Sequence, residues 1–275
     1  MIIISNKPGQ LGNLLFIYAN FLAYGLENKV KVFNPSFYQY HKYFKSTSSS
    51  SLSINKIIYT FCYLTARILF RLKIKTALIS ALALDWGESV DLENESQLNS
   101  KLCFVQGWLF RSDNLMINHK TDITRFFEPE ELFKNKINSF FAKNFTGTNC
   151  SIIAIHIRLG DYKTFENGKY YYTIEQYLNI IKNLALLFKT QNPHFLICSN
   201  EQINLSKKET DGLKITFAPG HELLDMYCLA NCNYIVGPPS TYSMWASFYG
   251  AVPLYMIEDA NKEIVIDDFK INLSA

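Results

Sequence analysis

The chain has 275 residues, which suits one large domain or two smaller domains with a substantial hydrophobic core. Hydrophobic residues make up 48% of the chain and aromatic residues 15%, and this composition excludes an intrinsically disordered protein. The formal net charge of only +3 argues against a nucleic-acid-binding protein.

The chain opens with the pattern of a parallel α/β sheet. Ile2–Ile4 is a short apolar run typical of a strand, and a turn-rich loop follows over Asn6–Asn13. Leu14–Leu26 then predicts a helix, and an alternating run after it predicts the next strand. At the end of the loop, Gly12 and Asn13 could bring backbone N–H groups close to an anionic ligand at the start of the helix. A tight turn without a ligand is the alternative.

A segment of one charge sign lies between Glu27 and Asp85, where no acidic residue occurs. Its basic residues are Lys29, Lys31, Lys42, Lys45, Lys56, Arg67, Arg71, Lys73 and Lys75. The segment favours contact with an anionic partner or surface, or else forms a solvated basic face. Four basic residues interrupt the apolar stretch Ile57–Leu84, so it does not predict a membrane-spanning helix. Residues 57–75 either form helices of the first domain or lie as a basic amphipathic helix on the surface of a membrane. In the second case, we expect a cytoplasmic protein that contacts the inner face of the membrane.

The rest of the chain continues the α/β pattern. Leu102–Trp108 predicts a strand that ends in a glycine, and Thr146–Asn149 predicts a linker between two domains, 1–148 and 149–275. The second domain opens with Ser151–Ile157, an apolar run typical of a strand that is covered on both faces. The predicted elements after it are helix Thr173–Phe188, strand His194–Cys198, strand Ile215–Ala218, helix Glu222–Ala230, strand Tyr234–Gly237, helix Ser240–Tyr249 and strand Val252–Ile257.

Polar residues follow three of these predicted strands, and in a parallel sheet such strand ends meet at one edge, where ligands bind. Strand alternation places His156 and Arg158 on the same side, and Asp161 follows them. An arginine there can hold a phosphate with two hydrogen bonds, and Asp161 can orient the arginine or a substrate hydroxyl. A structural Arg–Asp pair that closes a turn is the alternative. The other candidates at this edge are Ser199, Asn200, Ser240, Thr241 and Tyr242.

Five sequence blocks occur in an order that resembles a known enzyme family. They are Gly9–Ala19 (GQLGNLLFIYA), Phe104–Phe110 (FVQGWLF), Ile155–Tyr162 (IHIRLGDY), Leu196–Asn200 (LICSN) and Asp225–Trp245. Together they resemble the bacterial α-1,2-fucosyltransferase family, within the superfamily that includes NodZ-type and protein O-fucosyltransferases. The third block matches the HxRxGDY signature of that family. The chain departs from the family pattern at Leu14, at Pro238–Pro239 and at Met244.

The resemblance implies an α/β, GT-B-like fold in which two Rossmann-like domains face each other across a cleft. The N-terminal domain, with a helical insertion, would lie on the acceptor side, and the C-terminal domain would bind the nucleotide sugar. The implied reaction is an inverting transfer of fucose from GDP-fucose to a galactoside-type hydroxyl of a surface glycan or a lipid-linked oligosaccharide. The same fold with another nucleotide-activated sugar, and an inactive sugar- or nucleotide-binding module, are the alternatives.

The resemblance also implies roles for the candidate residues. Arg158 would bind the donor phosphates, and His156 would contact the nucleotide or a phosphate. The remaining donor-binding residues would be Gly12, Asn13, Ser199, Asn200, Ser240, Thr241 and Tyr242. The general base is left open between Asp161 and Glu166. Because the sequence holds no Asp-x-Asp motif and no close His–Cys cluster, we expect neither a metal nor a cofactor beside the donor substrate.

Overall fold

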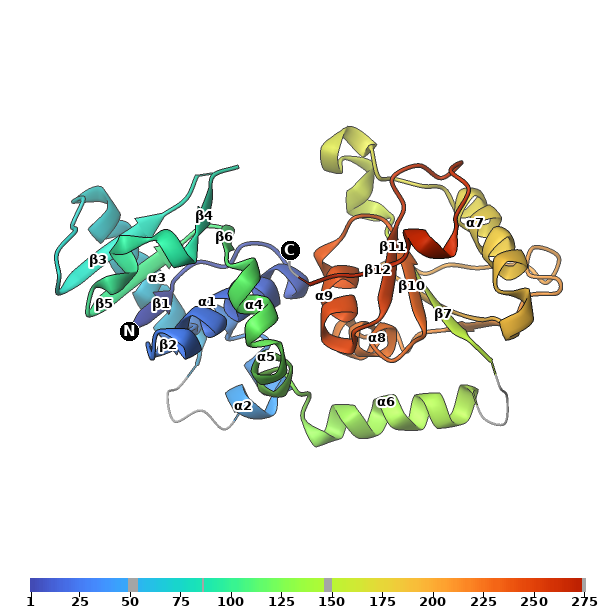
Figure 1. The fold of residues 1–275 in the computed structure, drawn as a ribbon, viewed down its shortest axis with the longest axis horizontal. Helices are drawn as coiled ribbons and strands as arrows, with labels where there is room; N and C mark the ends of the chain where they lie inside the picture. Colours follow the sequence, from blue (N-terminus) through green and yellow to red (C-terminus); the bar gives the residue numbers. More distant parts are fainter. Residues whose placement is uncertain (49–53, 86, 146–149, 274–275) are drawn as a thin grey trace. The chain divides into compact units, whose positions relative to one another are not determined.

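The computed structural model describes residues 1–48, 54–85, 87–145 and 150–273 (Figure 1). The chain divides into two compact units, Met1–Glu131 and Leu132–Asn272. We expected the boundary between residues 148 and 149, whereas the packing divides the chain near the start of helix α6 (Glu131–Asn144). The predicted linker Thr146–Asn149 lies outside the described residues.

Aromatic contacts explain why α6 counts with the second unit. The ring of Phe133 lies 5.8 Å from that of His221, measured between centroids. The ring of Phe145, which follows the helix, lies 4.6 Å from that of His194. Both histidines belong to the second unit, so α6 packs on it at both ends.

The first unit is built around a four-stranded parallel sheet of order β2-β1-β5-β3, with a separate parallel pair β4-β6. Its strands are β1 (Ile2–Ile4), β2 (Val32–Phe33), β3 (Ile79–Ala83), β4 (Ser89–Asp91), β5 (Leu102–Gln106) and β6 (Leu109–Arg111). Its helices are α1 (Leu11–Glu27), α2 (Lys45–Ser48), α3 (Lys56–Arg71), α4 (Asp113–Asn118) and α5 (Lys120–Phe126), with 3-10 turns η1 (Pro35–Phe37), η2 (His41–Tyr43), η3 (Leu92–Asn94) and η4 (Ser96–Asn99).

Helix α1 begins earlier than the sequence predicted. The amide of Leu14 donates to the carbonyl of Gln10 over 3.1 Å, which makes Gln10 the N-cap. Gly12 and Asn13 therefore belong to the first helical turn and not to the loop, and Gly12 is buried. Gly9 is the residue that needs the conformational freedom of glycine, with φ of 76° and the side chain of Asn13 folded over it.

The apolar stretch Ile57–Leu84, which carries four basic residues, forms helix α3 and strand β3 and not a pair of helices. Asn55 caps α3, because its side chain accepts a hydrogen bond from the amide of Ile58 over 3.0 Å. The helix ends where Lys73 takes a left-handed conformation with φ of 51°. A turn then leads into β3. In this turn, the amide of Thr76 donates to the carbonyl of Ile79 over 3.0 Å.

The second unit contains a six-stranded sheet of order β12-β11-β10-β7-β8-β9, parallel except for β12. Its strands are β7 (Ile152–Ile157), β8 (His194–Ser199), β9 (Ile215–Phe217), β10 (Tyr234–Gly237), β11 (Pro253–Met256) and β12 (Lys270–Ile271). Its further helices are α7 (Ile174–Leu187), α8 (Glu222–Leu229) and α9 (Thr241–Gly250), with 3-10 turns η5 (Gly160–Lys163), η6 (Phe165–Gly168), η7 (Lys189–Gln191) and η8 (Ile266–Asp268). Helix α7 lies on one side of the sheet, and α8 and α9 lie on the other (Figure 1).

The central strand β7 is buried along its length, as its apolar sequence predicted. Ile153, Ile155 and Ile157 pack with α7 in the main hydrophobic cluster of this unit. Strand β10 comes very close to β7 at Gly237, where a Cβ atom would lie 2.9 Å from both the Cβ and the carbonyl oxygen of His156. Only glycine fits between these two strands at that point.

Candidate functional site

The strand order of the second sheet indicates where a ligand can bind. From β7 the chain proceeds to β8 and β9 on one side and then returns to β10 and β11 on the other. The order therefore reverses between β7 and β10, and open α/β sheets bind ligands outside the carboxyl ends of the strands at such a point. The loop after β7 and the turn before α9 lie there.

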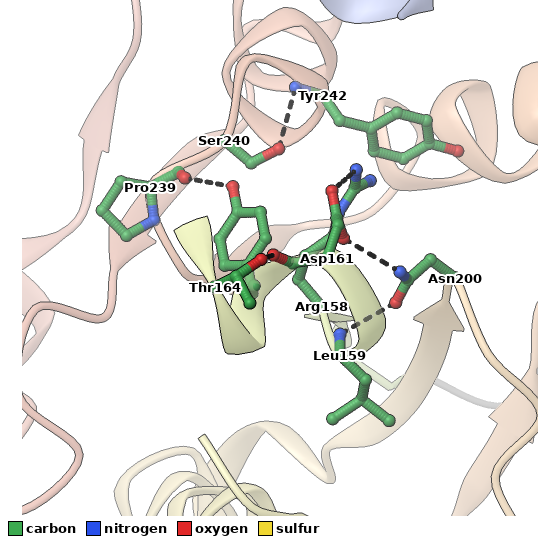
Figure 2. A network of polar contacts seen from close by, with 9 residues as sticks. Arg158, Leu159, Asp161, Thr164, Asn200, Pro239, Ser240 and Tyr242 are labelled. Atoms are coloured by element: carbon green, nitrogen blue, oxygen red, sulfur yellow. Dashed lines mark hydrogen bonds and ion pairs between the residues drawn. The ribbon is translucent and has the colours of Figure 1, made fainter. Parts of the chain in front are cut away.

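Arg158 and Asp161 form a bidentate ion pair in the loop after β7 (Figure 2). The Arg158 Nε donates to Asp161 Oδ1 over 3.1 Å, and Nη2 donates to Oδ2 over 2.8 Å. The side chain of Arg158 is only 14% exposed, whereas that of Asp161 is 51% exposed. The pair fixes the direction of the guanidinium and uses two of its five N–H donors.

Asn200 fastens this loop to the end of β8. Its side-chain oxygen accepts from the amide of Leu159 over 2.9 Å, and its side-chain nitrogen donates to Asp161 Oδ1 over 3.3 Å (Figure 2). Gly160 adopts a φ of 34° between these contacts, and a Cβ atom there would lie 2.6 Å from Glu201 Oε1. The backbone therefore passes close to the end of β8, and the carboxylate of Asp161 accepts three hydrogen bonds.

Tyr162 is a residue of this site that the sequence-based selection missed. Its hydroxyl donates to the carbonyl of Pro239 over 2.7 Å, so it ties the loop after β7 to the turn before α9. The Arg158 Cζ lies 5.4 Å from the centroid of its ring. The tyrosine four residues after the arginine was visible in the sequence, but its partner is a backbone carbonyl, which no side-chain pattern reports.

Ser240 caps helix α9, because its hydroxyl accepts from the amide of Tyr242 over 3.3 Å. Thr241 is the first residue of the helix. The hydroxyl of Tyr242 donates to the carbonyl of Glu222 over 2.7 Å and thereby joins α9 to α8. The ring of Tyr242 lies 5.0 Å from the ring of His156. Tyr242 thus supports the site through its ring and holds the helix through its hydroxyl.

His156 is buried, with 3% of its surface exposed, and its Nδ1 has no hydrogen-bond partner among the described residues. Burial, and then the positive charge of Arg158, lower the pKa of His156 from 6.5 to about 3. The ring is therefore neutral at ordinary pH. It cannot supply positive charge to an anionic ligand, and that role falls to Arg158.

Acid is expected to destabilise the protein through His156. The unfolded chain binds a proton there near pH 6.5, whereas the folded chain does so only near pH 3, so this stability is present above pH 6.5 and lost as the pH falls. The loss between about pH 7.5 and about pH 5 is roughly 2 kcal/mol. Urea unfolding at both pH values should show a smaller loss in His156→Gln by about that amount, and equal losses in the two proteins would contradict the shifted pKa.

The two candidate bases lie on consecutive 3-10 turns. Asp161 is in η5 and is held by Arg158 and Asn200. Glu166 is in η6, where it is exposed and its side chain has no hydrogen-bond partner within the described ranges. Glu166 and Asn167 both adopt left-handed backbone conformations, with φ of 49° and 56°. Two such residues in succession cost energy, and strain of this kind is concentrated at functional loops.

The structure brings together most of the residues that the sequence singled out. His156, Arg158, Asp161, Asn200 and the Ser240–Tyr242 turn gather at the switch point, and Ser199 ends β8 beside them. Gly12 and Asn13 belong to the first unit. No group of three or more His, Cys, Asp or Glu side chains that could hold a metal occurs in the described part of the chain. The expected absence of a metal stays a prediction.

Solved structures of fucosyltransferases resemble the whole chain. A mutant of FUT1 from Arabidopsis thaliana in complex with GDP matches with a TM-score of 0.66 and 13% identity, over 94% of this chain and 71% of that one. The NodZ α-1,6-fucosyltransferase soaked with GDP-fucose matches with a TM-score of 0.58 and 15% identity, over 96% and 97%. POFUT1 in complex with GDP-fucose matches with a TM-score of 0.56 and 10% identity, over 90% and 93%.

The fold is that of the GT-B fucosyltransferases. This confirms the predicted α/β, GT-B-like fold class with Rossmann-like parallel sheets. No protein-family model matches the chain, and no curated protein sequence matches it. At identities of 15% or less, this likeness establishes the fold alone.

Proposed function

We propose that the chain is an inverting glycosyltransferase that moves fucose from GDP-fucose to a hydroxyl of a surface glycan. The observation that carries the proposal is the largely buried side chain of Arg158, which Asp161 orients at the switch point of the second sheet. A fixed, permanently charged group at such a crevice suits a diphosphate, which is the leaving group of a nucleotide sugar.

Two further features of the site support a diphosphate ligand. Helix α9 begins beside the loop after β7, and the N-terminus of a helix favours anions. The guanidinium of Arg158 is a planar group of N–H donors, and its geometry matches phosphate oxygens. Together, the guanidinium and the helix terminus can stabilise the negative charge that develops on the leaving diphosphate without a metal.

The proposed reaction is a direct displacement at the anomeric carbon. The acceptor oxygen forms a bond to that carbon while the bond to the β-phosphate oxygen breaks, and the electron pair leaves with GDP. The configuration inverts, and the proton of the acceptor hydroxyl passes to a carboxylate. We assign this base to Glu166 and assign to Asp161 the positioning of Arg158, because three hydrogen bonds already occupy the Asp161 carboxylate.

The finer assignments rest on the sequence resemblance. The HxRxGDY signature at His156–Tyr162 supports an α-1,2 linkage to a galactoside-type hydroxyl. A glycan or a lipid-linked oligosaccharide is the proposed acceptor. His156, Ser199, Asn200 and Ser240–Tyr242 are proposed to line the donor pocket of the second unit.

GDP and GDP-fucose are expected to raise the unfolding temperature, whereas UDP and dTDP are not. A ligand at a hundredfold excess over its Kd stabilises a protein by about 2.7 kcal/mol, which corresponds to about 5 °C or more in a chain of this size. Thermal unfolding with each nucleotide measures the shift, and turnover of GDP-fucose with a galactoside acceptor measures transfer.

The outcomes separate the alternatives. Stabilisation by UDP or dTDP in place of GDP would assign another nucleotide-activated sugar. Stabilisation by GDP without any turnover of GDP-fucose would leave a binding module that lacks activity. A chain that responds to none of these nucleotides would contradict the proposed function altogether.

A further inference from the structure

Helix α3 carries an apolar stripe that faces away from the unit it belongs to. Ile57, Phe61, Leu64 and Ile68 follow one another at intervals of four, three and four residues, so they lie on one face of the helix. Leu72 continues the stripe past the end of the helix, and Leu78 lies in the turn that follows. The exposed fractions are 81% for Ile57, 69% for Phe61, 53% for Leu64, 59% for Ile68, 63% for Leu72 and 64% for Leu78.

The opposite face of α3 fastens the helix to the first sheet. Cys62, Ala66 and Leu69 are buried there and pack in one cluster with Ala81 of β3 and Phe104 of β5. The helix needs none of the exposed stripe for this packing. A contiguous row of exposed large apolar side chains marks an interaction surface, whereas apolar side chains exposed singly are ordinary.

Positive charge lies beside the stripe and no negative charge accompanies it. The basic residues of α3 and the turn after it are Lys56, Arg67, Arg71, Lys73 and Lys75. None of them forms an ion pair with another residue in the described ranges. Arg67 lies near Tyr63, whose ring centroid is 5.9 Å from the Arg67 Cζ. Because no acidic residue occurs between Glu27 and Asp85, the whole surrounding segment favours an anionic partner.

We propose that α3 and the turn after it bind the surface of an anionic lipid membrane, with the helix lying in the plane of the interface. The apolar stripe would enter the boundary between headgroups and acyl chains, and the basic side chains would contact the headgroup phosphates. No helix within the described residues is long and apolar enough to span a membrane. The combination of a large apolar stripe with cationic flanks is the chemistry of a peripheral lipid contact, whereas an acidic protein partner needs no such stripe.

The test is co-sedimentation of the full chain with vesicles, and it needs no sugar donor, so it does not depend on the proposed transferase activity. The wild-type chain should pellet with vesicles of phosphatidylglycerol and phosphatidylcholine at about 0.1 M salt and less at about 0.5 M salt. It should pellet weakly with phosphatidylcholine alone.

Two variants separate the two parts of the surface. The first, Arg67→Gln with Arg71→Gln, Lys73→Gln and Lys75→Gln, should lower the partition coefficient for anionic vesicles more than about tenfold. The second, Phe61→Ser with Leu64→Ser and Ile68→Ser, should lower it by a similar factor. The matched control removes four exposed lysines of the second unit, with Lys189→Gln, Lys207→Gln, Lys208→Gln and Lys270→Gln, and should bind as the wild type does.

Because the replaced side chains are exposed, circular dichroism and thermal unfolding should be unchanged in the charge variant even if the apolar variant folds poorly. A wild-type chain that stays in the supernatant would overturn the proposal, and so would equal losses in the charge variant and the lysine control. A dimer that the Phe61 variant dissociates, without vesicle binding, would assign the stripe to a second copy of the chain instead.

Discussion

Arg158→Lys is expected to lower kcat/KM for transfer from GDP-fucose by at least about 100-fold, with a parallel loss of GDP affinity. In the native site, Arg158 holds Asp161 through Nε and Nη2 on one edge of the guanidinium. A lysine has a single ammonium group, which would have to serve both Asp161 and the phosphates. Because lysine keeps the positive charge, the loss of kcat/KM and of GDP affinity would result from the missing geometry of the guanidinium. Calorimetric titration with GDP and initial rates with GDP-fucose measure the two effects.

Arg125→Lys is a matched control for this substitution. Arg125 also pairs with an aspartate three residues away, since its Nη1 lies 3.4 Å from Asp122 Oδ1, but its side chain is 73% exposed and belongs to the first unit. This variant should keep both GDP affinity and activity. If Arg158→Lys also kept GDP affinity near the wild-type value, the pair with Asp161 would be a structural closure of the turn and not a phosphate site.

The second large effect is expected from the two carboxylates. Glu166→Gln should lower kcat by about 10²–10⁴-fold while GDP affinity stays unchanged, because the amide cannot accept the proton of the acceptor hydroxyl. Asp161→Asn should weaken GDP binding, because Arg158 loses the charged partner that orients it. The split between kcat and affinity distinguishes the base from the positioning residue. Initial rates under donor saturation and GDP titration give both quantities.

An exposed glutamate elsewhere in the second unit provides the control for this pair. Glu263→Gln removes another exposed carboxylate and should change neither quantity. A Glu166→Gln enzyme with near wild-type kcat would exclude Glu166 as the base. If Asp161→Asn then lost kcat but kept its GDP affinity, the base would be Asp161.

The sequence predicted the second unit well because its central strands β7, β8 and β10 are mostly buried. An apolar run such as Ser151–Ile157 strongly favours a buried strand. The polar residues after it lie at the carboxyl edge of the parallel sheet, where the strands end. The register of β7 with β8 brings Ile157 opposite Ser199, and this alone makes Arg158 and Asn200 neighbours. The site at the switch point followed from the order of elements and needed no side-chain detail.

Other features depended on contacts that a linear pattern does not show. The start of α1 at Leu11 is set by a backbone hydrogen bond to Gln10, and no residue type marks it. The segment after Ile57 was predicted to be helical throughout, because the half-exposed helix α3 and the short strand β3 are both apolar and their sequences do not distinguish them. Helix α6 joined the second unit through rings at its two ends. The burial of His156, and with it the neutral state of the ring, depends on Tyr242 and Gly237, which lie about eighty positions along the chain.

Because Gly237 has no Cβ atom, it lets the loop after β7 and the turn before α9 lie close together in the candidate site. Strand β7 leads to Arg158 and strand β10 leads to the start of α9, and Gly237 of β10 faces His156 of β7 where a Cβ atom would not fit. A methyl group at this position would push the two strands apart at the base of the two loops. The width of the candidate site therefore depends on the backbone spacing of the sheet, and a change at Gly237 would alter it without replacing any candidate side chain.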